Sequence, residues 1–148
     1  MSNLQAVQPA LDEYHNMYRN PNLGKLRVSK PYALFPDTPN PTDIGLAGKW
    51  PDVWPDVDSP GVYLFLNANL DILYVGKTSL RQTFGARLYD WFKYEKGTRG
   101  CKVIGEWSHK PAYVATIPVK APFEAPSLEE YLFEELHPSD NLVGRKPR

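Results

Sequence analysis

The stretch SPGVYLFLNANLDILYVGKTS, at 59–79, places a tyrosine in each of two apolar runs and a Gly-Lys-Thr where the second run stops. A hairpin built only for packing would not need these polar residues. Arg87 and Glu129 follow in two later segments of amphipathic pattern. A guanidinium can hold anionic oxygens in a planar fork, a carboxylate binds hard divalent cations, and a phenol can exchange a proton. These are side chains of the types that act on a phosphate ester.

The pattern around the two tyrosines predicts a β-hairpin. GVYLFL at 61–66 and ILYVG at 72–76 are rich in aromatic and branched residues, and NANLD between them supplies turn chemistry. Because side chains alternate between the two faces of a strand, Tyr63 and Tyr74 can project from the same face. Gly76 would let the backbone pass close to substrate or to a helix.

Two helices and a third strand are predicted after the hairpin. ARLYDWFKYEK at 86–96 carries an apolar stripe, KPAYVATIPVK at 110–120 is typical of a strand, and APSLEEYLFEEL at 125–136 carries a second stripe. Ser127 and Glu130 match a capping box at the start of this last helix, and Pro138 ends it. The order β-β-α-β-α predicts an α+β fold, a small three-stranded antiparallel sheet flanked by helices.

Residues 1–58 are predicted to form a proline-rich arm that packs on a second unit at 59–148. Nine of the fifteen prolines lie in the first 60 residues, which argues against long helices and central strands there. One short helix is expected at 10–19. The apolar residues of the following segment are Tyr32, Leu34, Phe35, Ile44, Leu46, Trp50 and Trp54. They offer too much apolar surface for a free linker, so we expect them to be buried.

Composition excludes several classes of protein. The single Cys101 forbids an internal disulfide framework, no apolar run is long enough to span a bilayer, and the start of the chain lacks the pattern of a secretory signal, so a cytoplasmic protein without a membrane partner is expected. The formal charge is zero, but residues 77–110 hold eight Lys and Arg against three acids. Such a local basic face is compatible with a phosphate backbone and also with an ordinary solvated surface.

The arrangement GVY followed by YVG resembles the GIY-YIG nuclease family. The resemblance continues with Arg87 at the start of the first long helix, Glu129 in the second, and Asn141 after Pro138, and it covers residues 60–142. It implies an endonuclease that hydrolyses DNA phosphodiester bonds with one divalent metal ion, Mg²⁺ or Mn²⁺, at each site.

The resemblance also implies roles for the candidate catalytic residues. Tyr63 would activate water, Tyr74 would help to position it, and Lys77 would contact the phosphate or assist the base. Arg87 would hold the phosphate, and Glu129 would bind the metal. Nearby cations are expected to lower the pKa of the tyrosine that acts as base.

Eight further residues are expected to contact nucleic acid. They are Arg81, Lys93, Lys96, Arg99, Lys102, His109, Lys110 and Asn141. Arg87 lies farther from Gly76 than the arginine of many relatives does, so Arg81 remains an alternative to it. His109 is an alternative base, and a homodimer that cuts both strands is compatible with the sequence.

Two other classes of function stay open at this point. One is a non-catalytic module that binds nucleic acid through the same basic face. The other is a structural protein that binds a partner through its tryptophan-rich arm.

Overall fold

The predicted hairpin forms one side of the sheet, with its second strand at the edge. The computed structural model describes residues 2–41, 44–50, 52–53, 58–95, 100–101 and 106–141. β3 (Gly61–Leu66) pairs antiparallel with β4 (Ile72–Thr78), and β7 (Tyr113–Pro118) pairs antiparallel with the other side of β3. These three strands are the ones that the sequence predicts.

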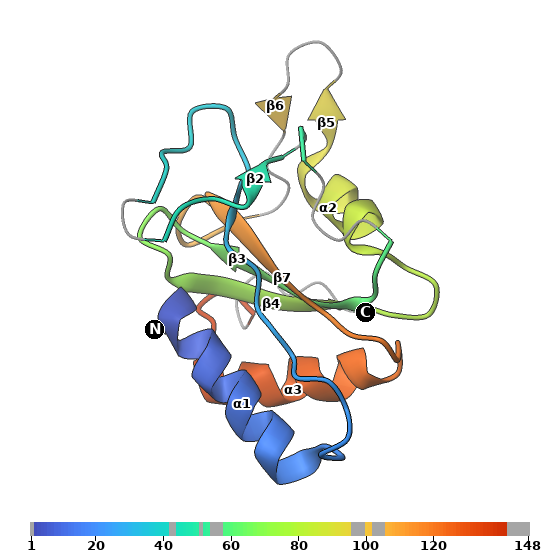
Figure 1. Cartoon of the computed structure of the whole chain (residues 1–148). Helices are drawn as coiled ribbons and strands as arrows, with labels where there is room; N and C mark the ends of the chain where they lie inside the picture. Colours follow the sequence, from blue (N-terminus) through green and yellow to red (C-terminus); the bar gives the residue numbers. More distant parts are fainter. Residues whose placement is uncertain are drawn as a thin grey trace.

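The sheet is nevertheless larger than predicted. β1 (Tyr32–Ala33) pairs with β7, and β2 (Gly48–Lys49) runs parallel to β1, which gives a mixed five-stranded sheet in the order β2-β1-β7-β3-β4 (Figure 1). The prediction of three strands was wrong because two-residue strands carry no alternating pattern, and the arm supplies them between its prolines. A separate pair, β5 (Tyr94–Glu95) and β6 (Gly100–Cys101), follows the first long helix.

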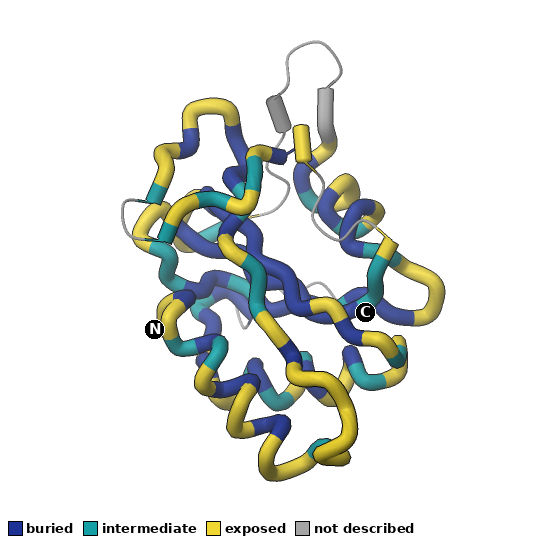
Figure 2. Tube along the Cα trace, in the orientation of Figure 1, coloured by how far each residue is buried: buried dark blue, intermediate teal, exposed yellow. Residues whose placement is uncertain are grey.

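Helices cover both faces of the sheet. α2 (Phe84–Phe92) lies on one face, and α1 (Val7–Tyr18), which follows the 3₁₀ turn η1 (Leu4–Ala6), lies with α3 (Glu124–Leu136) on the other (Figure 1). The strands between them are buried, whereas the outer faces of the helices are exposed (Figure 2). No helix in the described ranges has the length and hydrophobicity needed to cross a bilayer.

Strand alternation divides the core into two clusters. Val62, Leu64 and Leu66 pack in a cluster with the apolar stripes of α1 and α3. Tyr63 and Phe65 face the other way and pack with α2. Period-two alternation in β3 thus decides which residues lie beside which helix.

The arm is packed on the rest of the protein. Leu34, Phe35 and Trp50 are buried in the cluster beneath α2, as expected. Tyr32, Ile44 and Leu46 are only partly buried, and Trp54 lies outside the described residues. α1 is tied to α3 by an ion pair of 2.7 Å between Arg19 Nε and Glu124 Oε2.

α3 begins three residues before the predicted capping box. It starts at Glu124, so Ser127 lies inside the helix, where its hydroxyl donates to the Glu124 carbonyl at 3.1 Å. Pro126 falls in the first turn, where a backbone N–H has no intrahelical acceptor, and the missing donor therefore costs little. The predicted capping box was therefore wrong, because Ser127 lies inside α3 and not at its start.

Candidate active site

Tyr63 and Gly76 lie directly opposite each other in the β3–β4 pair. A Cβ built on Gly76 would lie 2.4 Å from Tyr63 Cζ, so only glycine leaves room for the phenol ring. The ring is 1% exposed and lies beside that of Tyr74, with centroids 6.2 Å apart and planes 30° apart. The two tyrosines therefore share a face of the hairpin, as predicted.

Gly61, the first residue of β3, pairs with Thr78, the last residue of β4. Its φ is +155°, and an added Cβ would lie 2.1 Å from the carbonyl oxygen of Ile117 in β7. Its backbone N–H donates to Thr78 Oγ1 at 3.0 Å. The same hypothetical Cβ would lie 2.8 Å from Phe84 Cζ, so this glycine also lets the start of α2 approach the sheet.

The Tyr63 hydroxyl meets two polar groups of α2. Trp91 Nε1 donates a hydrogen bond of 3.0 Å to it, and the positive charge of the Arg87 guanidinium acts on it. Arg87 and Trp91 are four residues apart, so one face of the helix presents both.

Burial raises the pKa of Tyr63 above its ordinary value, and the neighbouring Tyr74 raises it further. The Arg87 charge and the hydrogen bond from Trp91 lower this pKa, but burial outweighs them. The expectation that cations would bring the pKa down was therefore wrong for the protein without substrate. Tyr63 keeps its proton at neutral pH.

The sequence did not single out Trp91 as a functional residue. It was assigned to the apolar stripe of its helix, and its indole ring does contact Phe65 and Tyr74. Trp91 lies four residues after Arg87 and therefore on the same helix face, and this spacing could have predicted that Trp91 also reaches Tyr63.

Arg87 is only partly exposed, with 32% of its side chain accessible, and its charged partner is Asp90 Oδ2 at 4.0 Å. Among the described residues no hydrogen-bond acceptor faces its buried Nε. Arg81 differs, because it lies exposed on the loop between β4 and α2. Of the two arginines, Arg87 is the one that acts on the Tyr63 hydroxyl.

Lys77 and Glu129 lie on the opposite face of the sheet. Lys77 pairs with Val62 in the sheet, and the Val62 side chain faces α3. The Lys77 Nζ donates to Ser79 Oγ at 3.1 Å. Glu129 borders the buried stripe of α3, which packs on β4, and one of its carboxylate oxygens is shielded from solvent. β4 is an edge strand of the sheet. Its outer edge, called the rim below, separates the residues on the α2 side (Tyr63, Tyr74 and Arg87) from Lys77 and Glu129 on the α3 side.

The donor set fits a metal that needs few protein ligands. In the described ranges no cluster of three or more His, Cys, Asp or Glu side chains surrounds a common point. Mg²⁺ keeps several of its waters and is usually bound by one or two carboxylates together with substrate phosphates, so a single carboxylate such as that of Glu129 is compatible with it.

The residues expected to contact nucleic acid are spread over several elements. Lys93 Nζ lies 5.1 Å from the centroid of the Tyr89 ring, and Lys110 Nζ lies 4.2 Å from that of Phe35. His109 is exposed beside Ser108. Lys96, Arg99 and Lys102 lie outside the described residues.

Asn141 has a structural role where nucleic-acid contact was expected. It is 4% exposed; its Oδ1 accepts from the N–H of Val75 and its Nδ2 donates to the carbonyl of Val75, both at 2.8 Å. The preceding residues continue this pattern, because Asp140 N–H donates to Leu73 O at 2.7 Å. The segment after α3 thus covers the rim of β4 as far as Val75.

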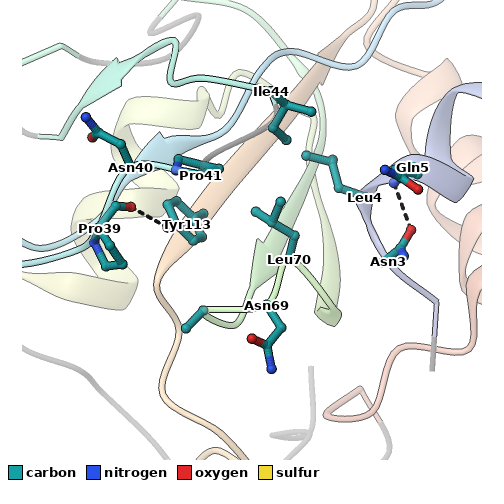
Figure 3. A pocket seen from close by; sticks show the side chains of 11 residues that line it. Asn3, Leu4, Gln5, Pro39, Asn40, Pro41, Ile44, Asn69, Leu70 and Tyr113 are labelled. Atoms are coloured by element: carbon teal, nitrogen blue, oxygen red, sulfur yellow. Dashed lines mark hydrogen bonds between the residues drawn. The ribbon is translucent and has the colours of Figure 1, made fainter.

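A hollow of about 360 Å³ lies away from these residues, at the turn end of the hairpin. It is bordered by residues 3–5, 39–41 and 68–70, and the Tyr113 hydroxyl donates to the Pro39 carbonyl beside it (Figure 3). None of the residues expected to do chemistry lines it.

One comparison with known proteins gives a match. A family model described as a UvrC-like GIY-YIG domain matches residues 59–142, which is more than half of the chain. No curated protein matches the chain. The matched range contains both tyrosines of the hairpin, Arg87, Glu129 and Asn141.

Proposed function

The chain belongs to the GIY-YIG nuclease family, and on that premise we propose that it is a divalent-metal-dependent endonuclease that hydrolyses phosphodiester bonds in DNA. The observation that carries the proposal is the convergence of Arg87 and Trp91 on the Tyr63 hydroxyl, beside the ring of Tyr74. An ordinary helix-on-sheet contact would not bring a guanidinium to a buried phenol.

Arg87 holds the scissile phosphate in this proposal. Charge accumulates on the non-bridging oxygens as water adds to phosphorus, and a guanidinium can bind two of those oxygens at once. The side chain is 32% accessible, so its guanidinium has N–H groups that can turn to a phosphate at the surface.

Tyr63 acts as a neutral phenol that orients the attacking water. Its raised pKa keeps the phenol neutral; its oxygen accepts from Trp91 through one lone pair, and the second can accept from the water, whose own oxygen stays free to attack phosphorus. Water adds to phosphorus, one P–O ester bond breaks, and the leaving oxygen gains a proton while the water loses one to solvent. Tyr74 packs against Tyr63 and keeps its ring in position.

Glu129 is the residue that would hold Mg²⁺ or Mn²⁺, which when bound would neutralise charge on the leaving oxygen. Lys77, on the same face of the sheet as Glu129, would contact the phosphate backbone. A substrate that meets all of these residues lies across the outer rim of β4 next to Gly76.

The test is a cleavage assay on plasmid and branched DNA with Mg²⁺, Mn²⁺ or EDTA. Glu129→Gln is compared with Glu130→Gln, which removes an exposed charge from the neighbouring position of the same helix. We expect metal-dependent cleavage that falls by about 100-fold or more in Glu129→Gln and stays unchanged in Glu130→Gln. Cleavage in EDTA, or full activity of Glu129→Gln, would contradict the proposal.

A further inference from the structure

The loop that joins β4 to α2 holds two residues in an unusual conformation. Leu80 has φ +53° and Arg81 has φ +73°, in the left-handed region that disfavours side chains with a Cβ. Leu80 is also 87% exposed, more than any other large apolar side chain among the described residues. For a leucine, both this backbone conformation and this exposure to water are unfavourable, so packing does not explain a leucine at this position.

The loop is short and held at both ends. Ser79 is buried, its hydroxyl accepts from Lys77 Nζ, and its carbonyl accepts from the Gln82 N–H at 3.1 Å. Thr83 then caps α2 through its hydroxyl, which accepts from the Ala86 N–H at 3.4 Å. Leu80 is therefore presented to solvent by a fixed turn.

The surroundings of the loop are cationic. Residues 72–89 contain Lys77, Arg81 and Arg87 and no Asp or Glu; Asp90, the next residue, lies 4.0 Å from the Arg87 guanidinium and is largely exposed. β4 carries Tyr74 and α2 carries Arg87, so the two elements that the loop connects are those that hold the candidate site. This charge is complementary to a polyanion, and an apolar side chain among cations suits the stacked bases behind a phosphate backbone.

We propose that Leu80 is a wedge that inserts between neighbouring base pairs of duplex DNA beside the scissile phosphate, while Arg81 binds a phosphate flanking that step. This inference rests on the proposed nuclease function. Proteins that kink DNA insert leucine and similar side chains between base steps, and the unstacked step bends the duplex towards the protein. Leu80 lies in this left-handed turn with its side chain 87% exposed.

The test compares two substrates for each protein: closed plasmid, whose bases are stacked, and a duplex that carries one-nucleotide gaps, which is already unstacked and flexible. Leu80→Ala is expected to slow cleavage of the closed plasmid by about tenfold or more and cleavage of the gapped duplex by less than about threefold. Leu80→Phe, which keeps an apolar wedge, is expected to cleave both substrates at close to the wild-type rate.

Leu23→Ala is the matched control, because Leu23 is an exposed leucine on the turn after α1. It should change neither rate. Equal slowing of both substrates by Leu80→Ala, or no slowing, would overturn the wedge and leave the nuclease standing. A wild-type protein that cleaves no DNA at all would overturn the proposed function and this inference with it.

Discussion

At the scale of single residues, the site depends on a tyrosine packed against a glycine. Tyr63 occupies the space that a side chain at position 76 would need, and the Cβ of any other residue there would lie 2.4 Å from the phenol ring. The glycine is thus part of the architecture of the site, because it sets how deeply Tyr63 is buried and where its hydroxyl meets α2.

Gly76→Ala should therefore lower the free energy of unfolding by about 1–3 kcal/mol, because the methyl group displaces the Tyr63 ring from a packed core. Urea unfolding measures the change. In a Tyr63→Ala background the same substitution should cost clearly less, since the clashing ring is gone. Equal costs in the two backgrounds would show that the two residues do not share this space.

The raised pKa of Tyr63 makes stability depend on alkaline pH. An unfolded tyrosine ionises near pH 10, whereas the folded protein holds this proton to higher pH, so the stabilisation is complete below about pH 10 and is lost as the pH rises above it. The slope for one such group is about 1.4 kcal/mol per pH unit. Tyr63→Phe should reduce the alkaline slope of the unfolding free energy, measured in urea, by up to that amount, and an unchanged slope would contradict the assignment.

The sequence predicts much of this site because the relevant residues follow strand and helix periods. Alternation placed Tyr63 and Tyr74 on one face, and Arg87 was preferred to Arg81 because an amphipathic helix follows it. The electrostatics could not be predicted in the same way. Whether burial or a nearby cation decides the pKa of Tyr63 depends on the depth of the ring in a core built by distant segments.

At the scale of elements, the Asn141 side chain hydrogen-bonds to the rim of β4 as the backbone of a neighbouring strand would. Asn141 accepts from and donates to the backbone of Val75 through its amide, in the manner of a neighbouring residue in a sheet. An open edge strand would expose unpaired backbone groups. Within the described part of the chain, which ends at Asn141, this covering reaches Val75, and Gly76 and Lys77 of the candidate site follow next along β4.

Asn141→Ala should lower the free energy of unfolding by about 1–3 kcal/mol, because the N–H and carbonyl of Val75 lose their partner in a buried position. Thermal or urea unfolding reads the effect. Ser139→Ala is the control for the same segment, since the Ser139 hydroxyl donates to Asp140 Oδ1 at 2.6 Å and only the backbone of Ser139 contacts β4. A neutral Asn141→Ala would mean that water replaces the amide.

Elements with a clear period were predicted, and those without one were missed. The hairpin, β7 and both later helices were found, whereas β1 and β2 were not, because each has two residues and depends on pairing with β7 or with each other. The start of α3 was placed at Ser127 because a capping pattern there was locally convincing. The helix extends back to Glu124, whose carboxylate pairs with Arg19 of the arm.

At the scale of the whole molecule, the candidate site is divided between two faces of the sheet. Tyr63, Tyr74 and Arg87 lie on the side of α2, and Lys77 and Glu129 lie on the side of α3. In the proposed mechanism, residues on both faces must therefore reach a phosphate at the rim of β4. Sequence order alone could not give this arrangement, because it depends on which face each helix covers.

The most direct test of that requirement is a double-mutant cycle on DNA cleavage with saturating Mg²⁺. Arg87→Lys, which keeps the charge and loses the planar fork, and Glu129→Gln are measured singly and together. If both residues stabilise the transition state at one phosphate, the double variant should be little slower than the slower single variant. Independent, multiplicative losses, or a single variant with wild-type activity, would show that the two faces do not serve one site.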